Sequence, residues 1–211
     1  SLAGVLDDDA RARERYPISE IEVADIADHP GNAAYSMDEG AIRSLAESIR
    51  RDGLTDIPLV RRLDDGSFQM ISGHRRKKAC ELAGIDKMPV IVRNMDRDEA
   101  IIFMVDSNLQ RERLLPSEKA FSYKIKLDAM KRKQGERTDL TSAPMVQKLT
   151  SRELLAEKSA DSHEQVRRYI RLTELTPDLL QMVDDGKIAF RPAVELSYLT
   201  KEDVAKKLFD E

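Results

Sequence analysis

The stretch Phe68-Gln69-Met70-Ile71-Ser72-Gly73-His74-Arg75-Arg76-Lys77-Lys78-Ala79 decides the fold of this chain. Residues 68–71 are mostly apolar and predict a strand, Gly73 predicts a tight turn, and the residues after it predict a helix. The basic side chains therefore lie in the first helical turn, where unpaired N–H groups and the helix dipole favour an anion. Gly73 would let that ligand approach the backbone closely. The stretch indicates a phosphate site, and the alternative is a solvated basic helix start.

The composition favours a helical protein of one large or two small domains. Of the 211 residues, 35% are charged and 5% are aromatic, and there is no Trp, which argues against a β-sandwich or barrel. A net charge of −4 means that any nucleic-acid binding must come from local patches. The single Cys80 excludes an internal disulfide and fits the cytoplasm, and its apolar surroundings predict a buried side chain. We find neither a membrane span nor a signal peptide and expect no membrane partner.

The first part of the chain alternates strand and helix patterns. Residues 1–20 are polar, and we interpret them as a tail or a cloning scar. Residues 18–26 predict an edge strand, and 57–61 and 68–71 predict a hairpin around Asp64-Asp65-Gly66. Ser36-Met37-Asp38-Glu39 has the pattern of a capping box, before a helix that Gly53 ends. The apolar face of this helix is predicted to consist of Ile42, Leu45, Ala46 and Ile49. A strand at 88–92 and a helix at 99–108 complete an α/β domain over residues 21–113.

The second part, residues 114–211, is predicted to be all helical. Pro116 suits the first turn of a helix that runs to about residue 133 and carries a basic side that includes Lys124 and Lys126. Two further capping boxes, at residues 150–153 and 162–165, begin short helices joined by residues 159–161. Ala156 and Val166 have the ten-residue spacing that packs the two helices of a helix-turn-helix.

The second of these helices is the candidate DNA-reading element. Gln and Arg side chains read base edges and hold phosphates, and several are expected to point outward here. The alternative is an ordinary antiparallel helix pair with a charged face. The candidate DNA-binding residues are Ser162, His163, Gln165, Arg167, Arg168 and Arg171.

Five ordered stretches make residues 20–200 similar to the ParB family of plasmid and chromosome partition proteins. The chain resembles the branch whose phosphate motif begins Gly-His-Arg-Arg. The matching stretches are Leu45-Ala46-Glu47-Ser48-Ile49 with Gly53, Gly73-His74-Arg75-Arg76, Asn108-Leu109-Gln110-Arg111-Glu112, Pro116-Ser117-Glu118-Lys119-Ala120, and residues 171–196.

The resemblance implies an α+β protein: a small ParB/sulfiredoxin-like nucleotide domain followed by an all-α helix-turn-helix domain. It implies a homodimer that binds a palindromic, centromere-like DNA site and that CTP with Mg²⁺ closes into a sliding clamp. Slow CTP hydrolysis would reset the clamp, a ParA-type ATPase would be a partner, and the protein would be associated with the nucleoid. The implied nucleotide-binding residues are Gly73, His74, Arg75, Arg76, Ser107, Asn108 and Arg111, with Asn108 also serving Mg²⁺.

Several residues depart from the family pattern. Ser107 replaces a Glu that the family associates with the metal and with hydrolysis, so we expect a weakened CTPase, and Asp106 would point elsewhere on a helix. Asn32-Ala33-Ala34 lacks the Arg of the family's first loop, and Pro58 stands one place late after Gly53. These changes bear on the preference for cytosine. The family's C-terminal dimerisation domain is not found before Glu211, and we interpret the chain as truncated.

Two other classes of protein stay open. One is a helix-turn-helix transcription regulator without nucleotide gating. The other is a free-nucleotide-dependent kinase-like or sulfiredoxin-like enzyme on the same N-terminal fold, for which Cys80 is the only thiol. His29, His74 and His163 lie too far apart in sequence to predict a metal cluster.

Overall fold

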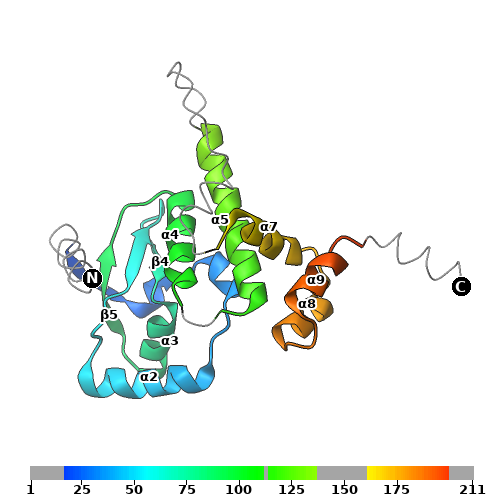
Figure 1. Ribbon diagram of the computed structural model, residues 1–211. Helices are drawn as coiled ribbons and strands as arrows, with labels where there is room; N and C mark the ends of the chain where they lie inside the picture. The colour runs from blue at the N-terminus through cyan, green and yellow to red at the C-terminus, as the bar shows by residue number, and fades with distance from the viewer. Residues whose placement is uncertain (1–16, 112–113, 137–160, 200–211) are drawn as a thin grey trace, which may run out of the picture. The chain divides into compact units, whose positions relative to one another are not determined.

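A computed structural model describes residues 17–111, 114–136 and 161–199 (Figure 1). The chain divides into two compact units, Ser1–Met104 and Val105–Glu211, and each is described by itself. The division falls inside helix α4 (Arg97–Leu109). The boundary between residues 113 and 114 that the sequence suggests stays a prediction.

The first unit contains a mixed five-stranded sheet in the order β1-β5-β3-β4-β2. β1 is antiparallel to β5, β3 and β4 form the predicted antiparallel hairpin, and the pairs β3–β5 and β2–β4 are parallel. The strands are β1 (Ile18–Glu22), β2 (Ile26–Ala27), β3 (Leu59–Arg62), β4 (Phe68–Ser72) and β5 (Lys87–Val92). With the helices described below, the sheet confirms the predicted α+β class.

The single edge strand expected at residues 18–26 is in fact two strands at opposite edges of the sheet. The short 3-10 helix η1 (Val23–Asp25) separates them. The backbone N–H of Val23 donates to the Asp86 carbonyl oxygen at 2.7 Å, and the Val23 side chain is buried in the core. The chain therefore turns at Val23, because burial of this side chain and a backbone hydrogen bond both hold it there.

Helices α2 (Glu39–Asp52) and α3 (His74–Ala83) pack together against the sheet (Figure 1). Ile42, Ala46 and Ile49 of α2 are buried, as the sequence periodicity predicts, and Cys80 of α3 is fully buried. The predicted start of α2 is wrong in detail. Asp38 caps the helix, and its Oδ1 accepts hydrogen bonds from the N–H groups of Gly40 (2.8 Å) and Ala41 (3.2 Å). Ser36 therefore lies outside the helix.

The second unit is helical in its described part and is centred on α5. Its helices are α5 (Pro116–Glu136), α7 (His163–Leu172), α8 (Pro177–Asp184) and α9 (Phe190–Leu196). Tyr169 of α7 lies between Tyr123 of α5 and Phe190 of α9, with ring centroids 5.9 and 4.6 Å away. This aromatic contact joins three helices into one core.

Lys126 was predicted to lie on an exposed basic face of α5, but the structure buries it. Its side chain is 1% exposed, and its ammonium group donates to the carboxylate of Asp106. Buried charges need a partner, and Asp106 supplies it. Among the described helices, none is long and apolar enough to cross a lipid bilayer.

Candidate functional site

The turn before α3 is built around Gly73 and Pro58. Gly73 caps the helix in the left-handed region, with φ 111° and ψ 18°, which favours glycine. A Cβ at this position would lie 2.7 Å from Cβ of Pro58. We expected the missing side chain to admit a ligand, but the structure places Pro58 there. Gly73 is therefore explained by its φ angle and by the packing of Pro58.

His74 points into the protein and connects α3 to the loop after β2. The side chain is buried, and its Nε2 accepts a hydrogen bond from the backbone N–H of His29 at 3.3 Å. The ring of His29 in turn accepts a hydrogen bond at Nδ1 from the N–H of Gly31 at 3.0 Å. His74 therefore holds the backbone at His29, where the helix η2 (Pro30–Ala34) begins. The sequence alone did not decide between this structural role and a phosphate contact.

The environment of His29 disfavours its charged form. Burial lowers the pKa of the imidazole, and the nearby Arg61 and Arg97 lower it further. A neutral ring is also required if Nδ1 is to accept the hydrogen bond from Gly31. Protonation of His29 and the native loop geometry are therefore incompatible.

We expect the stability of the first unit to fall as the pH is lowered from 7.5 to 5.5. The unfolded imidazole has a pKa of about 6.5 and takes up a proton before the folded one, whose pKa is lowered. The loss begins as the pH falls through about 6.5, with a slope of at most about 1.4 kcal/mol per pH unit, and ends below the folded pKa. Urea denaturation at a series of pH values measures it.

His29→Asn should flatten this pH dependence, although it lowers stability at pH 7.5. His163→Asn is the matched control, because His163 is exposed at the start of α7. A His29→Asn variant with the full slope of the parent chain would show that another group titrates.

The basic residues of the α3 motif have different partners. Nζ of Lys77 lies 3.1 Å from Asp28 Oδ1, and its side chain is only 11% exposed. Nη2 of Arg76 lies 2.9 Å from Oδ2 of Asp56. Arg75 is exposed and forms no ion pair with another residue in the described ranges. Arg75 and Arg76 are thus the guanidinium groups that an incoming anion can reach.

Asn32, in the middle of η2, has a buried oxygen without a partner. Among the described side chains, its Oδ1 is the buried polar atom for which no hydrogen bond is found. The residue is 5% exposed, and a Cβ on the preceding Gly31 would lie 2.8 Å from Cε of Met104. A buried acceptor without a donor is energetically costly, so Asn32 marks a point where hydrogen bonding within the loop is incomplete.

The remaining predicted nucleotide-binding residues belong to the second unit. Ser107 and Asn108 lie in the last turn of α4, and the N–H of Arg111 donates to the Asn108 carbonyl oxygen at 3.0 Å. Asn108 is 7% exposed. The carboxylate of Asp106 accepts a hydrogen bond from the ammonium group of Lys126. In the described ranges no three His, Cys, Asp or Glu side chains form a metal-binding group.

Four of the predicted DNA-binding side chains on helix α7 are exposed. Oγ of Ser162 accepts a hydrogen bond from the N–H of Gln165 at 3.3 Å, which confirms the predicted cap. Val166 is buried, whereas His163, Gln165, Arg167 and Arg168 are exposed. Glu164 pairs with Arg168 (3.4 Å) and Arg167 (3.8 Å). The expected partner helix, with Ala156 and the cap at 150–153, lies outside the described residues.

Arg171 was predicted to point outward to DNA, but in the structure it contacts other residues of the second unit. Its guanidinium group donates to Oγ of Ser197 at 3.1 Å and to the Ser197 carbonyl oxygen, and lies 4.3 Å from the ring centroid of Tyr198. Ser197 caps the C-terminal end of α9, where a cation is favoured. These internal contacts give Arg171 a role in holding α9 against α7.

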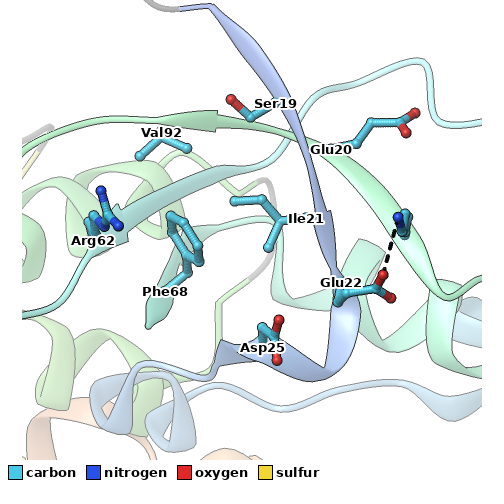
Figure 2. Close-up of a pocket in the computed structure, with 9 residues that line it drawn as sticks. Ser19, Glu20, Ile21, Glu22, Asp25, Arg62, Phe68 and Val92 are labelled. Atoms are coloured by element: carbon cyan, nitrogen blue, oxygen red, sulfur yellow. Dashed lines mark ion pairs between the residues drawn. The ribbon is translucent and has the colours of Figure 1, made fainter. Parts of the chain in front are cut away.

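A separate hollow of about 560 Å³ lies on the sheet of the first unit. Figure 2 shows Phe68 and Ile21 between Arg62 and Glu22. The carboxylate of Glu22 forms an ion pair with Lys87, and the charged atoms are 3.3 Å apart. The predicted nucleotide- and DNA-binding residues do not line this hollow. We therefore treat it as distinct from the candidate sites.

Comparison with known proteins identifies relatives of the chain. Residues 7–109 match the family model of the ParB N-terminal domain. The chromosome-partitioning protein Spo0J of Thermus thermophilus is 30% identical over 183 residues, which cover 87% of this chain and 61% of that protein. The stage 0 sporulation protein J of Bacillus subtilis is 28% identical over 172 residues, which cover 82% and 54%. The chain thus spans little more than half the length of these relatives.

Solved structures share the fold. The C-terminally truncated chromosome-partitioning protein ParB from Caulobacter crescentus, complexed to the centromeric parS site, has a TM-score of 0.55 and 22% identity over 91% of each chain. A Pnob8-like ParB-N domain has a TM-score of 0.58 and 18% identity over 93% of this chain and 85% of that one. Through the match of residues 7–109 to its family model, the N-terminal part of the chain is identified as a domain of the ParB family.

Proposed function

We propose that the chain is part of a DNA partition protein that binds a palindromic, centromere-like site and is gated by CTP. In this proposal CTP with Mg²⁺ closes a homodimer into a clamp that slides on DNA. The observation that carries the proposal is the match of residues 7–109 to the ParB N-terminal domain, which includes the motif at the start of α3. The similarity to the chromosome-partitioning protein of Thermus thermophilus supports a place on the nucleoid.

The residues of the α3 motif fit the phosphates of a nucleotide. Arg75 is exposed and Arg76 is 29% exposed, and both belong to the first turn of the helix. The planar guanidinium fork matches phosphate oxygens, and the first N–H groups of a helix attract anions. The buried acceptor of Asn32, in the loop that His74 orders, would suit an amino group of the base. We propose Gly73 and His74 as residues that shape the site and do not touch the phosphates.

Mg²⁺ and hydrolysis are the parts of the proposal that depend on α4. Asn108 offers a hard oxygen suited to Mg²⁺, and Arg111 follows three residues later. Ser107 has no charge to offer a metal or an attacking water, and the carboxylate of Asp106 is engaged by Lys126. We therefore expect nucleotide binding with slow turnover of CTP to CDP and phosphate.

DNA binding is assigned to α7. Its exposed face carries Gln165, Arg167 and Arg168, and Ser162 fixes the first turn of the helix by its cap. Gln165 in the first turn would lie nearest the base edges, and the arginines would hold phosphates. The proposed partners are double-stranded DNA, a second copy of the chain and a ParA-type ATPase.

The structure bears on the enzymatic alternative through Cys80. The thiol is fully buried, and burial raises its pKa, so the reactive thiolate is disfavoured. Sulfiredoxin-like redox chemistry at Cys80 is therefore not supported. A transcription regulator with the same α7 but without nucleotide gating is the second candidate, favoured by the exposed Gln165 and Arg face.

A nucleotide titration with and without palindromic DNA tests the proposal. We expect CTP with Mg²⁺ to release heat on binding and ATP, GTP and UTP to bind more weakly, with phosphate released slowly. No heat with any triphosphate, with DNA present or absent, would exclude the clamp. Retained DNA binding in that case would favour the transcription regulator.

A further inference from the structure

One of the two reachable arginines of the α3 motif already has an anion beside it. Nη2 of Arg76 donates to Oδ2 of Asp56 at 2.9 Å. The Asp56 side chain is 77% exposed, and the Arg76 side chain is 29% exposed. The carboxylate thus lies at the surface and holds a guanidinium group that the proposed function assigns to phosphate.

The backbone on both sides of Asp56 is anchored. Leu54 packs against the core of the first unit. Pro58 is buried, its carbonyl oxygen accepts a hydrogen bond from the N–H of Ile91 at 2.8 Å, and its side chain fills the space beside Gly73. Asp56 lies two residues from each anchor. The fold therefore keeps this carboxylate near the first turn of α3.

The neighbouring cations of the motif have different environments. Lys77 pairs with Asp28 and, at 3.5 Å, with Glu81, and its low exposure makes these contacts structural. Arg75 is exposed, without an ion pair to another described residue. Lys78 is exposed and pairs with Glu81 at 2.8 Å, but it lies beyond the first turn of α3. Among the described residues of the first turn, Arg76 is the cation that is both reachable from solvent and paired with an exposed carboxylate.

We infer that Asp56 is an internal competitor of the nucleotide phosphates for Arg76. A phosphate oxygen and the Asp56 carboxylate use the same guanidinium donors, so nucleotide binding must open or weaken the Arg76–Asp56 pair. Without a ligand, Arg76 of the motif is paired with Asp56. The strength of this pair sets how much affinity a phosphate ligand gains from Arg76. The inference rests on the proposed function, because it concerns the same nucleotide site.

Asp56→Asn tests this role, because the amide keeps the shape of the side chain and removes its charge. Calorimetric titration of CTP with Mg²⁺ at low salt should give a dissociation constant lower by about 1.5- to fivefold, the range expected for an exposed ion pair. The gain should vanish at about 1 M salt, where charges are screened within about 3 Å. Asp56→Ser is a second variant without the charge and should show the same gain.

Two comparisons isolate the pair. Asp52→Asn removes one charge from another exposed pair of the same unit, that of Asp52 with Arg51 at 2.9 Å, and should leave the affinity for CTP unchanged. In an Arg76→Ala background, Asp56→Asn should give a clearly smaller gain, because no guanidinium is left to compete for.

The outcomes separate this inference from the proposed function. If the parent chain binds CTP and Asp56→Asn binds it equally or more weakly, Asp56 is not a competitor and the proposed function stands. An equal gain with and without Arg76 would also overturn the inference, because it would indicate general repulsion. If neither chain binds a triphosphate, the nucleotide site itself is wrong, and the inference is overturned with it.

Discussion

Arg76→Ala is expected to weaken binding of CTP with Mg²⁺ by about 1.5–3 kcal/mol, the range for hydrogen bonds to a charged group. Arg76 lies in the first turn of α3, and its guanidinium group is the reachable donor that the fold holds closest to Asp56. Its removal deletes a fork of donors that Lys77 does not replace, because Lys77 is engaged by Asp28. Isothermal titration calorimetry at low salt measures the loss.

Arg51→Ala is the matched control, since Arg51 is an exposed arginine of the same unit that pairs with Asp52. It should leave the affinity for CTP unchanged. Arg76→Ala should also leave initial DNA binding intact, because α7 belongs to the other unit. If the Arg76→Ala variant binds CTP as tightly as the parent chain, Arg76 is not part of the nucleotide site.

Gln165→Ala is expected to cost about 1–3 kcal/mol at the cognate DNA site and to relax sequence preference. Gln165 is exposed in the first turn of α7, and its own N–H is fixed by Ser162 Oγ, so its side chain is well placed to read a base edge. Arg168→Ala should weaken all DNA sequences alike and reduce the salt slope by about one. Fluorescence anisotropy over a salt series distinguishes the two effects.

Arg191→Ala, on the exposed surface of α9, is the control for the loss of one positive charge outside α7. It should change the affinity for DNA less than Arg168→Ala does. Neither change on α7 should alter the affinity for CTP in the absence of DNA. If Arg168→Ala binds DNA normally at moderate salt, α7 has only a structural role and the DNA assignment fails.

Local patterns in the sequence predicted the elements that depend on neighbouring residues. The 3.6-residue periodicity of Ile42, Ala46 and Ile49 predicted the buried face of α2, because helix geometry alone brings them together. The turn at Asp64-Asp65-Gly66 predicted the hairpin of β3 and β4. The cap at Ser162 predicted the start of α7 and hence its exposed face.

Contacts between residues far apart in sequence could not be predicted in this way. The hydrogen bond from the His29 N–H to His74 spans 45 positions, the contact of Arg171 with Ser197 spans 26, and that of Lys126 with Asp106 spans 20. Each of these side chains is polar and had a reasonable solvent-exposed or ligand-binding interpretation on its own helix. The tertiary fold decided otherwise, because it brought a matching donor or acceptor within reach.

The ten residues from Ile18 to Ala27 supply both edge strands of the sheet. β1 lies along β5, and β2 pairs with Phe68 and Gln69 of β4, so one short segment pairs with both strands that would otherwise be outermost. A chain shortened past residue 27 would lose both short edge strands at once and make the longer β5 and β4 the edges, which favours edge-to-edge aggregation. Any shorter version of this domain must therefore keep the segment whole, although it carries none of the proposed nucleotide-binding residues.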